Sequence, residues 1–435
     1  MLRLLRLWLR FVRIFITCWL SAFDYLGRRV LAGRLDGEGV EHLRGEVLAR
    51  LLQRLGATFI KFGQILSTRP DLIGPGFIQP LARLQDAVPP APFEAVRQVL
   101  DEELGKDRQA ALLAEITPTP VAAASVAQVH RARLRTGEVV ALKVQRPDAR
   151  AQIERDLSIL TFWAKLLDRF EAIRMLSLPG AVQRFGDALH GQLDFRREAD
   201  NNRRFAAAFA EVENVSVPRL FDELCTERVL GMEFVEGVKA TEPEKVGGDR
   251  AKLARLGGEA VLKMIFADGF VHADLHPGNI ILTPDDRVVL IDLGMVSEIP
   301  ADLLRPWVET FVALSQQNGA ECARLFYVHA PTVGKHTDYA AFERDVVSFL
   351  TGLYDKKLGE VEVSAAVSGM MNILRRHRVQ IDPSFTVVNI ALLVAEGLGK
   401  QLDPSIDLVP LATPYLSQAM LTAPAGRAPG REIPS

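Results

Sequence analysis

The stretch His272-Ala273-Asp274-Leu275-His276-Pro277-Gly278-Asn279 gathers polar side chains, and Ile291-Asp292-Leu293-Gly294 follows it closely in the chain. Asp274 and Asn279 are five positions apart, and an apolar run at 288–291 leads into Asp292. Such a run indicates a buried strand that ends at the second aspartate. Carboxylate and amide oxygens are the hard ligands that Mg²⁺ prefers. The pattern therefore predicts loops that bind Mg²⁺ and phosphate groups.

Two kinds of site agree with these residues. The order Asp, Asn, Asp matches a protein-kinase catalytic loop, in which Asp274 orients or deprotonates a hydroxyl while Asn279 and Asp292 hold Mg²⁺. His272, Asp274 and His276 alternate, so an extended segment could instead direct all three at a transition-metal ion, or they could be ordinary loop residues. The metal alternative leaves Asn279 and Asp292 without a role, so the first interpretation is favoured.

Upstream, an apolar strand at 139–144 carries one lysine, Lys143. A turn at 136–138 joins it to a strand at 128–134, which predicts a hairpin. A lysine in a strand is usually solvated. Here Ala141 and Gln145 share its face, which favours a lysine that holds the α- and β-phosphates of a nucleotide.

Before the hairpin, Ala122-Ala123-Ala124-Ser125 stands where a kinase has a glycine-rich loop. Small residues let the backbone approach phosphates, but three Cβ atoms restrict φ where glycines would not. We expect this loop to bind the nucleotide phosphates differently from a glycine-rich loop and to change the preference between ATP and ADP. Further on, a strand at 229–235 runs into Glu236-Gly237. This is typical of a hinge whose backbone, at Glu233 and Val235, meets the adenine edge.

With these residues the chain resembles the UbiB/AarF family of atypical kinases, which is associated with quinone biosynthesis. The resemblance extends from about residue 46 to residue 407, and the alanine loop and the Lys-x-Gly-Gln motif together are specific to the family. It is carried by Lys61-Phe62-Gly63-Gln64, Ala122–Ser125, Lys143, Asp194, Glu198, Asp274, Asn279 and Asp292.

The resemblance implies an α+β, two-lobed protein-kinase-like fold with a family-specific helical extension before the small lobe. It implies that Glu198 lies on a helix and pairs with Lys143, and that ATP or ADP binds with Mg²⁺. The helix with Lys61, Gly63 and Gln64 is expected to lie over the active site and to block the path of a protein substrate. The expected activity is therefore ATP hydrolysis, or transfer to a small or lipid-bound substrate.

The helix with Lys61 is also indicated by periodicity. Apolar residues recur at spacings of three and four over residues 47–66, which predicts an amphipathic helix. Lys61, Gln64 and Thr68 fall on another face of that helix. Without the resemblance, this polar row would be interpreted as a solvated face.

The sequence departs from the family at one position. In the family the aspartate equivalent to Asp194 is preceded two residues earlier by glutamate, and this acidic pair receives the lysine of the Lys-x-Gly-Gln helix. Here that residue is Gln192. The loss of one carboxylate weakens the expected tether on Lys61, which can still bond to Asp194 and to the Gln192 amide oxygen.

The first 23 residues contain four arginines and no acidic residue. On a helix Arg3, Arg6, Arg10 and Arg13 share one side, and leucines and aromatic residues fill much of the rest, as in a helix that lies in a membrane interface. The uncharged run at 14–23 is too short to span a bilayer. A core or interaction helix and a signal sequence are the alternatives. We expect a cytoplasmic protein peripherally associated with the inner membrane through this segment.

Composition bounds the remaining choices. A net charge of −2 over 435 residues argues against a general nucleic-acid binder. Three scattered cysteines form no metal or redox spacing and suit a reducing compartment. The expected organisation is a basic amphipathic segment at 1–35, a helical extension at 36–115 that is interrupted by turns at 70–80 and 89–92, a small lobe with a helical insertion at 116–241, a helical large lobe at 242–421, and a disordered tail at 422–435.

Three functions remain open. The first is an atypical kinase or ATPase that uses Mg-ATP to support synthesis of ubiquinone or a related quinone at the membrane. The others are a nucleotide-switched scaffold with negligible turnover and a lipid-presenting protein. The complete set Lys143, Glu198, Asp274, Asn279 and Asp292 favours the enzyme, because a degenerate site does not need all five. The implied partners are membrane lipids, quinone precursors and other quinone-biosynthesis proteins.

Overall fold

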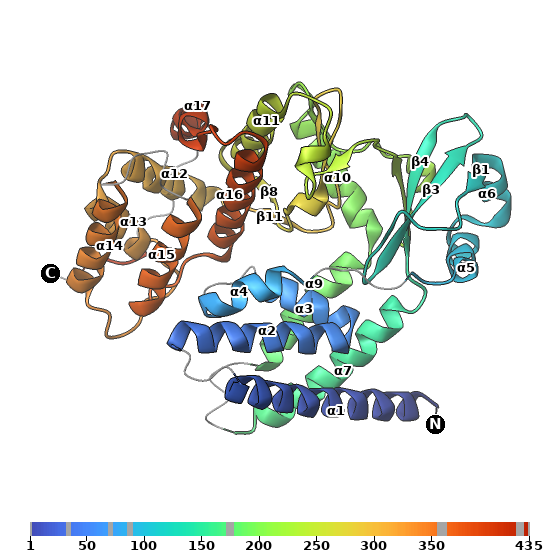
Figure 1. The fold of residues 1–435 in the computed structure, drawn as a ribbon, viewed down its shortest axis with the longest axis horizontal. Coiled ribbons are helices and arrows are strands. Elements are labelled where there is room, and N and C mark those ends of the chain that lie inside the picture. Colours follow the sequence, from blue (N-terminus) through green and yellow to red (C-terminus); the bar gives the residue numbers. More distant parts are fainter. Residues whose placement is uncertain are drawn as a thin grey trace. The chain divides into compact units, whose positions relative to one another are not determined.

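The computed structural model describes residues 2–31, 36–67, 73–84, 90–170, 178–354, 363–422 and 430–433. Its fold is shown in Figure 1. The chain divides into two compact units. Unit 1 contains Met1–Thr68, Leu72–Asn202 and Pro218–Phe234, and unit 2 contains Arg69–Asp71, Arg203–Val217 and Val235–Ser435.

Unit 1 is built around an antiparallel five-stranded sheet with the order β1-β3-β4-β6, in which β2 pairs with β3. The predicted hairpin forms, with Val129 of β3 opposite Lys143 of β4 and with Gly137 at φ 95° in its turn. The strands are β1 (Leu113–Ile116), β2 (Ala122–Ala123), β3 (Ala127–Leu134), β4 (Val139–Gln145) and β6 (Val229–Glu233).

The two faces of this sheet bury different helices. On one face Val140 and Leu142 pack against α5 (Phe93–Leu104), which is followed by α6 (Lys106–Leu112). On the other face Ala141 packs with α7 (Ala149–Leu167), α9 (Leu178–Gln192) and the start of α10 (Phe195–Ala208). Lys143 lies on the second face, because side chains alternate along a strand.

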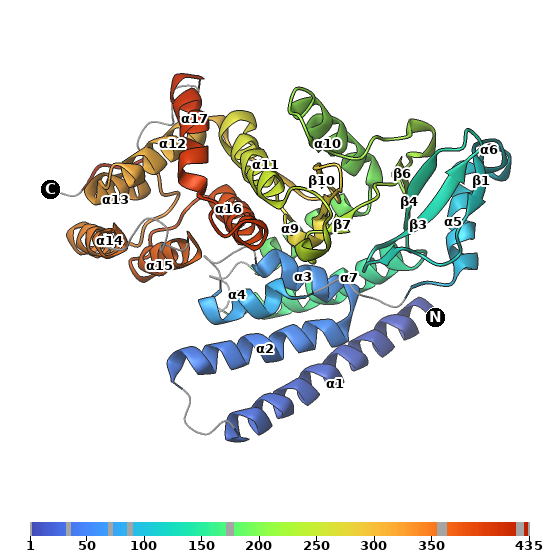
Figure 2. The same ribbon diagram turned by 45° about the horizontal axis from the view of Figure 1, so that its top comes forward.

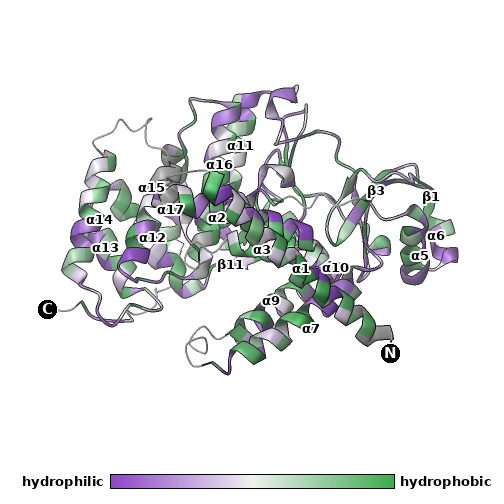
Figure 3. Ribbon diagram, turned by 60° about the horizontal axis from the view of Figure 1, so that its bottom comes forward, coloured by the Kyte–Doolittle hydropathy of each residue, from purple (hydrophilic) through white to green (hydrophobic). Residues whose placement is uncertain are grey.

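The remaining helices of unit 1 are α1 (Leu2–Leu31), α2 (Gly37–Leu55), α3 (Ala57–Ser67) and α4 (Pro75–Ala82). Figures 1 and 2 show α1 beside α2. A turn was expected over residues 70–80, but α4 begins at Pro75, whose missing N–H costs nothing in the first helical turn. Figure 3 shows hydrophobic residues in green and hydrophilic residues in purple on these helices.

The expected N-terminal helix forms as α1, but one of its arginines has a different environment from the one expected. Arg10 was expected among arginines that attract lipid headgroups. Its guanidinium instead bonds to Asp156 of α7 at 2.6 and 2.8 Å and to the Leu55 carbonyl oxygen at 2.7 Å. Within the described residues, no helix is both long and apolar enough to cross a membrane.

Unit 2 combines helices with two small sheets. Its four-stranded sheet has the order β5-β10-β9-β7, and a separate pair joins β8 to β11. The strands are β5 (Val215–Ser216), β7 (Val238–Lys239), β8 (Phe270–His272), β9 (Ile280–Leu282), β10 (Val288–Leu290) and β11 (Val296–Glu298).

A large apolar core holds the helices of unit 2 together, and it includes Phe342, Val388 and Trp307. Helix α11 continues into a π-helical stretch, Met264–Asp268, which is followed by Gly269 with φ 60°. The helices are α11 (Arg250–Lys263), α12 (Ala301–Ser315), α13 (Gly319–Val328), α14 (Tyr339–Tyr354), α15 (Val363–Arg376), α16 (Pro383–Leu402) and α17 (Leu408–Thr422).

The disordered tail expected at 422–435 stays a prediction, but residues 430 and 431 make contacts in the structure. Gly430 N–H donates to the Val328 carbonyl oxygen at 2.9 Å, and Arg431 Nη2 donates to the Ala330 carbonyl oxygen at 2.9 Å. The Arg431 guanidinium also lies 5.7 Å from the centroid of the Tyr327 ring. These residues bind the end of α13. Residues 423–429, 434 and 435 lie outside the described residues.

Candidate nucleotide site

Lys143 and Glu198 form the pair that the family resemblance implied. Lys143 Nζ donates to the two carboxylate oxygens of Glu198 at 2.8 and 2.9 Å. Both side chains are buried, and Nζ lies 5.5 Å from the centroid of the Phe195 ring. A buried ion pair gives little net stability because both charges lose their hydration. The role of the pair must therefore be assigned from the groups around it.

Backbone contacts position the helix that carries Glu198. The Phe195 N–H, at the start of α10, donates to the Glu227 carbonyl oxygen at 2.9 Å. Gln145, at the end of the strand with Lys143, donates to the Leu193 carbonyl oxygen at 2.7 Å. The strand and the helix are thus joined within a few residues of both charged groups.

The alanine loop forms a narrow turn next to β3. Ala122 and Ala123 pair with Val129 and Gln128, and the Ala124 N–H donates to the Ala127 carbonyl oxygen at 2.8 Å. Ser125 is buried, and its Oγ has no hydrogen-bond partner among the described residues. A buried hydroxyl without a partner costs about 1–3 kcal/mol. The loop therefore fits a ligand with acceptor oxygens, as a nucleotide phosphate has.

The predicted hinge follows β6. Glu233 is the last residue of this strand, and its N–H donates to the Arg219 carbonyl oxygen at 2.8 Å. The chain passes from unit 1 to unit 2 between Phe234 and Val235. The expected adenine contacts at Glu233 and Val235 remain a prediction.

In unit 2, His272 ties the loop with Asp274 to the strand that delivers Asp292. The Asp274 N–H donates to His272 Nδ1 at 3.2 Å, so Nε2 carries the proton and donates to the Ile291 carbonyl oxygen, also at 3.2 Å. Burial lowers the pKa of His272 and keeps the ring neutral. The motif predicted the loop, but not this connecting role of its first histidine.

Asn279 and Asp292 come from loops that are bonded to one another. Asn279 Nδ2 donates to the Asp274 carbonyl oxygen at 3.0 Å, and the Ile291 N–H donates to the Asn279 carbonyl oxygen at 2.9 Å. The amide nitrogen is thus used internally, and the Asn279 side-chain oxygen is the atom that suits a cation. Asp292 is exposed at φ 56°, a left-handed conformation that aspartate tolerates better than most residues. The donor atoms fit Mg²⁺.

The transition-metal alternative receives no support. Both ring nitrogens of His272 are engaged within the loop, and His276 Nδ1 accepts the Gly278 N–H at 3.0 Å. In the described part of the chain, no three His, Cys, Asp or Glu side chains are grouped as metal ligands. These histidines shape the loop instead.

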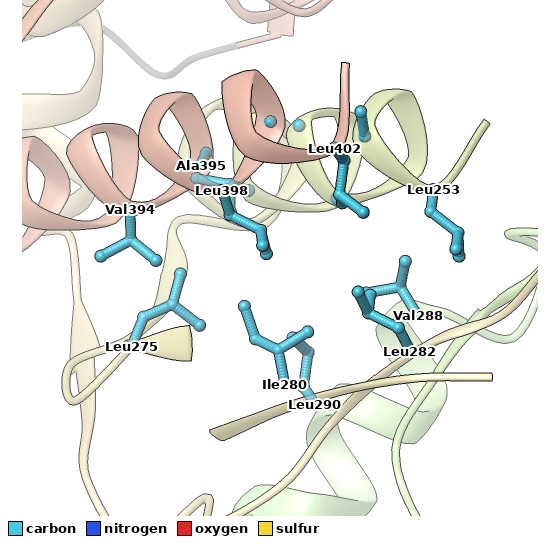
Figure 4. Close-up of a pocket in the computed structure, with 15 residues that line it drawn as sticks. Leu253, Leu275, Ile280, Leu282, Val288, Leu290, Val394, Ala395, Leu398 and Leu402 are labelled. Carbon is cyan, nitrogen blue, oxygen red and sulfur yellow. The ribbon is translucent and has the colours of Figure 1, made fainter. Parts of the chain in front are cut away.

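A small apolar cavity of about 20 Å³ lies next to the loop that carries Asp274 (Figure 4). Leu275 and Ile280, each adjacent to a predicted site residue, line it together with leucines of α11 and α16. The side chains labelled in Figure 4 are all apolar, so the lining of the cavity is mainly hydrocarbon. We interpret it as a packing gap beneath the loop.

The Lys-x-Gly-Gln motif lies on α3, and the solvated interpretation of its polar row is wrong for the described residues. Lys61 is buried, and Gln64 Nε2 donates to the Leu84 carbonyl oxygen at 2.9 Å. A Cβ at Gly63 would collide with Leu84 and lie 2.8 Å from Leu52 Cδ1. Gly63 therefore allows α3 to pack closely against Leu52 and Leu84, and Gln64 fixes it there by a hydrogen bond. Thr68 lies outside the described residues.

Asp194 is held by a residue that the sequence had not indicated. Arg196 Nε and Nη2 donate to the two carboxylate oxygens of Asp194, each at 2.8 Å, and this bonding lowers the pKa of Asp194. Gln192 is the last residue of α9. The expected tether from Lys61 to Asp194 remains a prediction.

Comparison with known proteins identifies the family. Residues 83–326 match the ABC1 atypical kinase-like domain, and residues 346–407 match the UbiB helical domain. The chain belongs to the UbiB/ABC1 family of atypical kinase-like proteins. Its fold is the expected α+β, two-lobed protein-kinase-like fold with an N-terminal helical extension.

Relatives of the chain occur in bacteria and plants. It is 35% identical over 387 residues to the probable protein kinase UbiB of Aeromonas hydrophila, covering 87% of this chain and 70% of that protein. It is 31% identical to the protein ACTIVITY OF BC1 COMPLEX KINASE 3, chloroplastic, of Arabidopsis thaliana, covering 87% and 53%. The solved structure of Rv3197 from Mycobacterium tuberculosis, a complex with erythromycin, shares the fold with a TM-score of 0.55 at 24% identity over 78% of this chain and 90% of that chain.

Proposed function

We propose that the protein is an atypical kinase or ATPase that uses Mg-ATP to support the synthesis of ubiquinone or a related quinone. The observation that carries the proposal is the buried, two-bond pair of Lys143 and Glu198, in a chain that also keeps Asp274, Asn279 and Asp292. The five residues together match the phosphate-binding and Mg²⁺-binding groups of a kinase site, which the buried pair alone would not indicate.

Each residue has a role in the proposed reaction. Lys143, oriented by Glu198, would bind the α- and β-phosphates, and the Asn279 oxygen and the Asp292 carboxylate would hold Mg²⁺. The bound Mg²⁺ supplies positive charge that neutralises the phosphates. The acceptor oxygen forms a bond to the γ-phosphorus while the bond to the β–γ bridging oxygen breaks, and the acceptor's proton passes to Asp274.

The acceptor in this proposal is water, a small molecule or a lipid-associated molecule. The support is the family's Lys61 helix, which is expected to block a protein substrate and which here is packed through Gly63 and Gln64. Quinone precursors are phenolic and lipid-bound, so they offer a hydroxyl of the required kind. We further propose that the protein works peripherally at the inner membrane, where α1 supplies the contact.

The experiment is the rate of Mg²⁺-dependent ATP turnover by the purified full chain. It is measured with and without anionic vesicles and a soluble phenolic quinone precursor, and an Asp292→Asn variant serves as the inactive control. Turnover that depends on Asp292 supports the proposal. Tight nucleotide binding without turnover in any condition would favour a nucleotide-switched scaffold.

A further inference from the structure

A second cavity, of about 350 Å³, lies in unit 2 at the edge of the four-stranded sheet. It is lined by the edge strand β5, by the end of α10 and the turn after it, and by the residue before β10. Small-molecule ligands usually occupy cavities of roughly 300–1,000 Å³. None of the lining residues belongs to the candidate nucleotide site, so this cavity needs an explanation of its own.

One wall of the cavity is apolar and held in place by packing. Phe209, in the turn after α10, is buried and stacks on Phe205, with ring centroids 6.1 Å apart and planes inclined by 12°. Lys263 Nζ lies 5.7 Å from the centroid of the Phe209 ring. Ala206 and Ala210, both exposed, also line the cavity, and their methyl groups take up little of its space. This wall therefore fits a small apolar group.

Polar side chains line the cavity where it meets the sheet, and they are Asn214, Ser216 and Arg287. Because β5 and β10 pair in parallel, Arg287, directly before β10, lies beside Asn214, directly before β5. Arg287 Nε donates to Asp285 at 2.7 Å, and its two Nη groups have no partner within the described residues. The Asn214 amide and the Ser216 hydroxyl also have none in that part of the chain. The cavity thus holds hydrogen-bond donors that the protein does not use.

The backbone of the edge strand adds a further donor. The Val288 N–H donates to the Asn214 carbonyl oxygen at 2.8 Å, so this carbonyl points toward β10. In a trans peptide plane the carbonyl oxygen and the N–H point in opposite directions, so the Val215 N–H points away from β10. Val215 lines the cavity and is buried, and among the described residues no acceptor bonds to its N–H. Buried N–H groups are almost always paired, so water or a ligand must supply the acceptor.

The charge of the cavity selects among possible acceptors. A guanidinium with free Nη groups and a nearby backbone N–H suit an anion with acceptor oxygens. Asp285 already shares the Arg287 charge, so a carboxylate with one negative charge suits the cavity better than a phosphate monoester, which carries about −1.5 to −2 at pH 7.

We propose that this cavity binds a small carboxylic acid with an apolar body, from a free organic acid or from the C-terminal residue of a peptide. The carboxylate bonds to the Arg287 Nη groups and to the Val215 N–H, and the apolar body packs against Phe209. The inference does not depend on the proposed function, because it concerns other residues and needs no nucleotide.

The first experiment tests the ligand chemistry by ligand-observed NMR with the full chain in the absence of nucleotide. The probes are 3-phenylpropionate, its neutral analogue 3-phenylpropionamide, phenyl phosphate and the tripeptide Ala-Ala-Phe. We expect the acid to bind at least roughly tenfold more tightly than the amide and more tightly than phenyl phosphate. Equal affinity for acid and amide, or no binding of either acid or tripeptide, would overturn the proposal. Tighter binding of the tripeptide than of the acid would support the site and assign it to peptide ends.

The second experiment places the site with matched variants. Ala206→Trp fills the cavity from an exposed helix position, and Ala207→Trp makes the same change at the next exposed residue, which does not line the cavity. We expect Ala206→Trp to abolish binding of 3-phenylpropionate and Ala207→Trp to leave it unchanged. Unchanged binding by Ala206→Trp, or an equal loss in both variants, would overturn the assignment.

A further pair of variants tests the charged contact. We expect Arg287→Met to bind 3-phenylpropionate at least roughly tenfold more weakly, because the carboxylate loses its charged donor. Arg255→Met, which removes an exposed arginine of α11 outside the cavity, should bind it as the wild type does. Circular dichroism and the midpoint of thermal unfolding show that the variants are folded. Equal affinity of Arg287→Met and the wild type would contradict the proposed contact.

Discussion

Two buried ion pairs in unit 1 have nearly the same geometry and different surroundings. Lys143 and Glu198 lie 2.8 Å apart and join the central sheet to α10, whereas Arg10 and Asp156 lie 2.6 Å apart and join α1 to α7. The first pair lies on the sheet that also carries the alanine loop, where the Ser125 hydroxyl has no partner among the described residues, and the second joins helices that pack around an apolar cluster. Chemistry alone therefore does not assign a role to a buried pair. Its neighbours do.

The largest effect is expected at the first pair. Lys143→Met removes the charge that would bind the phosphates, so Mg²⁺-dependent ATP turnover should fall by roughly 100-fold or more. The matched control is Lys400→Met, which breaks a lysine–glutamate pair within α16 at 2.9 Å. Equal turnover in the two variants would contradict the phosphate-binding role of Lys143.

At the second pair the expected effect is on stability. Asp156→Ala leaves the Arg10 guanidinium without its carboxylate, and the free energy of unfolding should fall by roughly 3–5 kcal/mol in chemical denaturation. Asp24→Ala removes a partly exposed partner of Arg28 and should cost less than about 1 kcal/mol. A decrease of less than about 1 kcal/mol in the free energy of unfolding of Asp156→Ala would mean that the Arg10–Asp156 pair does not hold α1 against α7.

Two glycine-to-alanine substitutions compare a closely packed helix position with an open one by their effect on stability. Gly63→Ala forces a methyl group into Leu84 and Leu52 and should destabilise the chain by roughly 1–3 kcal/mol. Gly257→Ala, in α11 beside the small cavity, meets no atom within 4 Å and should stabilise by roughly 0.5–1 kcal/mol. Thermal or chemical unfolding of both variants measures this, and the same sign for both would contradict the packing described.

The smallest effect concerns pH. His130 is buried, its Nδ1 faces the Thr117 carbonyl oxygen at 2.8 Å, and burial lowers its pKa. Below about pH 6.5 the unfolded chain binds a proton that the folded chain does not, so stability is complete above this pH and falls below it. A His130→Asn variant should lose part of this pH dependence, about 1.4 kcal/mol per pH unit at most. An unchanged slope would mean that His130 is charged in the folded chain.

Local sequence patterns predicted the parts of the site that depend on short-range order. The apolar run of β4 and the turn at Gly137 specify the hairpin, and the motif around Asp274 specifies its loop, because neighbours in sequence determine both. The pair of Lys143 and Glu198 spans 55 positions and was predicted only through the family resemblance.

Tertiary contacts decided what the sequence could not. Arg10 shares a helix side with other arginines, and nothing local distinguishes it from a solvated one; its partner Asp156 lies 146 positions away. The expected turn over 70–80 became α4 because Pro75 falls at a helix start, where proline is tolerated. Composition predicts a disordered end of the chain, and it gives no sign of the hydrogen bond from Arg431 to the Ala330 carbonyl oxygen, just after α13.

The central claim is that this chain turns over nucleotide with the Asp274, Asn279 and Asp292 loops. The most direct measurement is the rate of phosphate release from Mg-ATP by the full chain on anionic vesicles, beside the Asp292→Asn variant. The account predicts turnover in the wild type and a loss of at least roughly 100-fold in the variant. Equal rates in the two proteins, or no release by the wild type despite nucleotide binding, would contradict it.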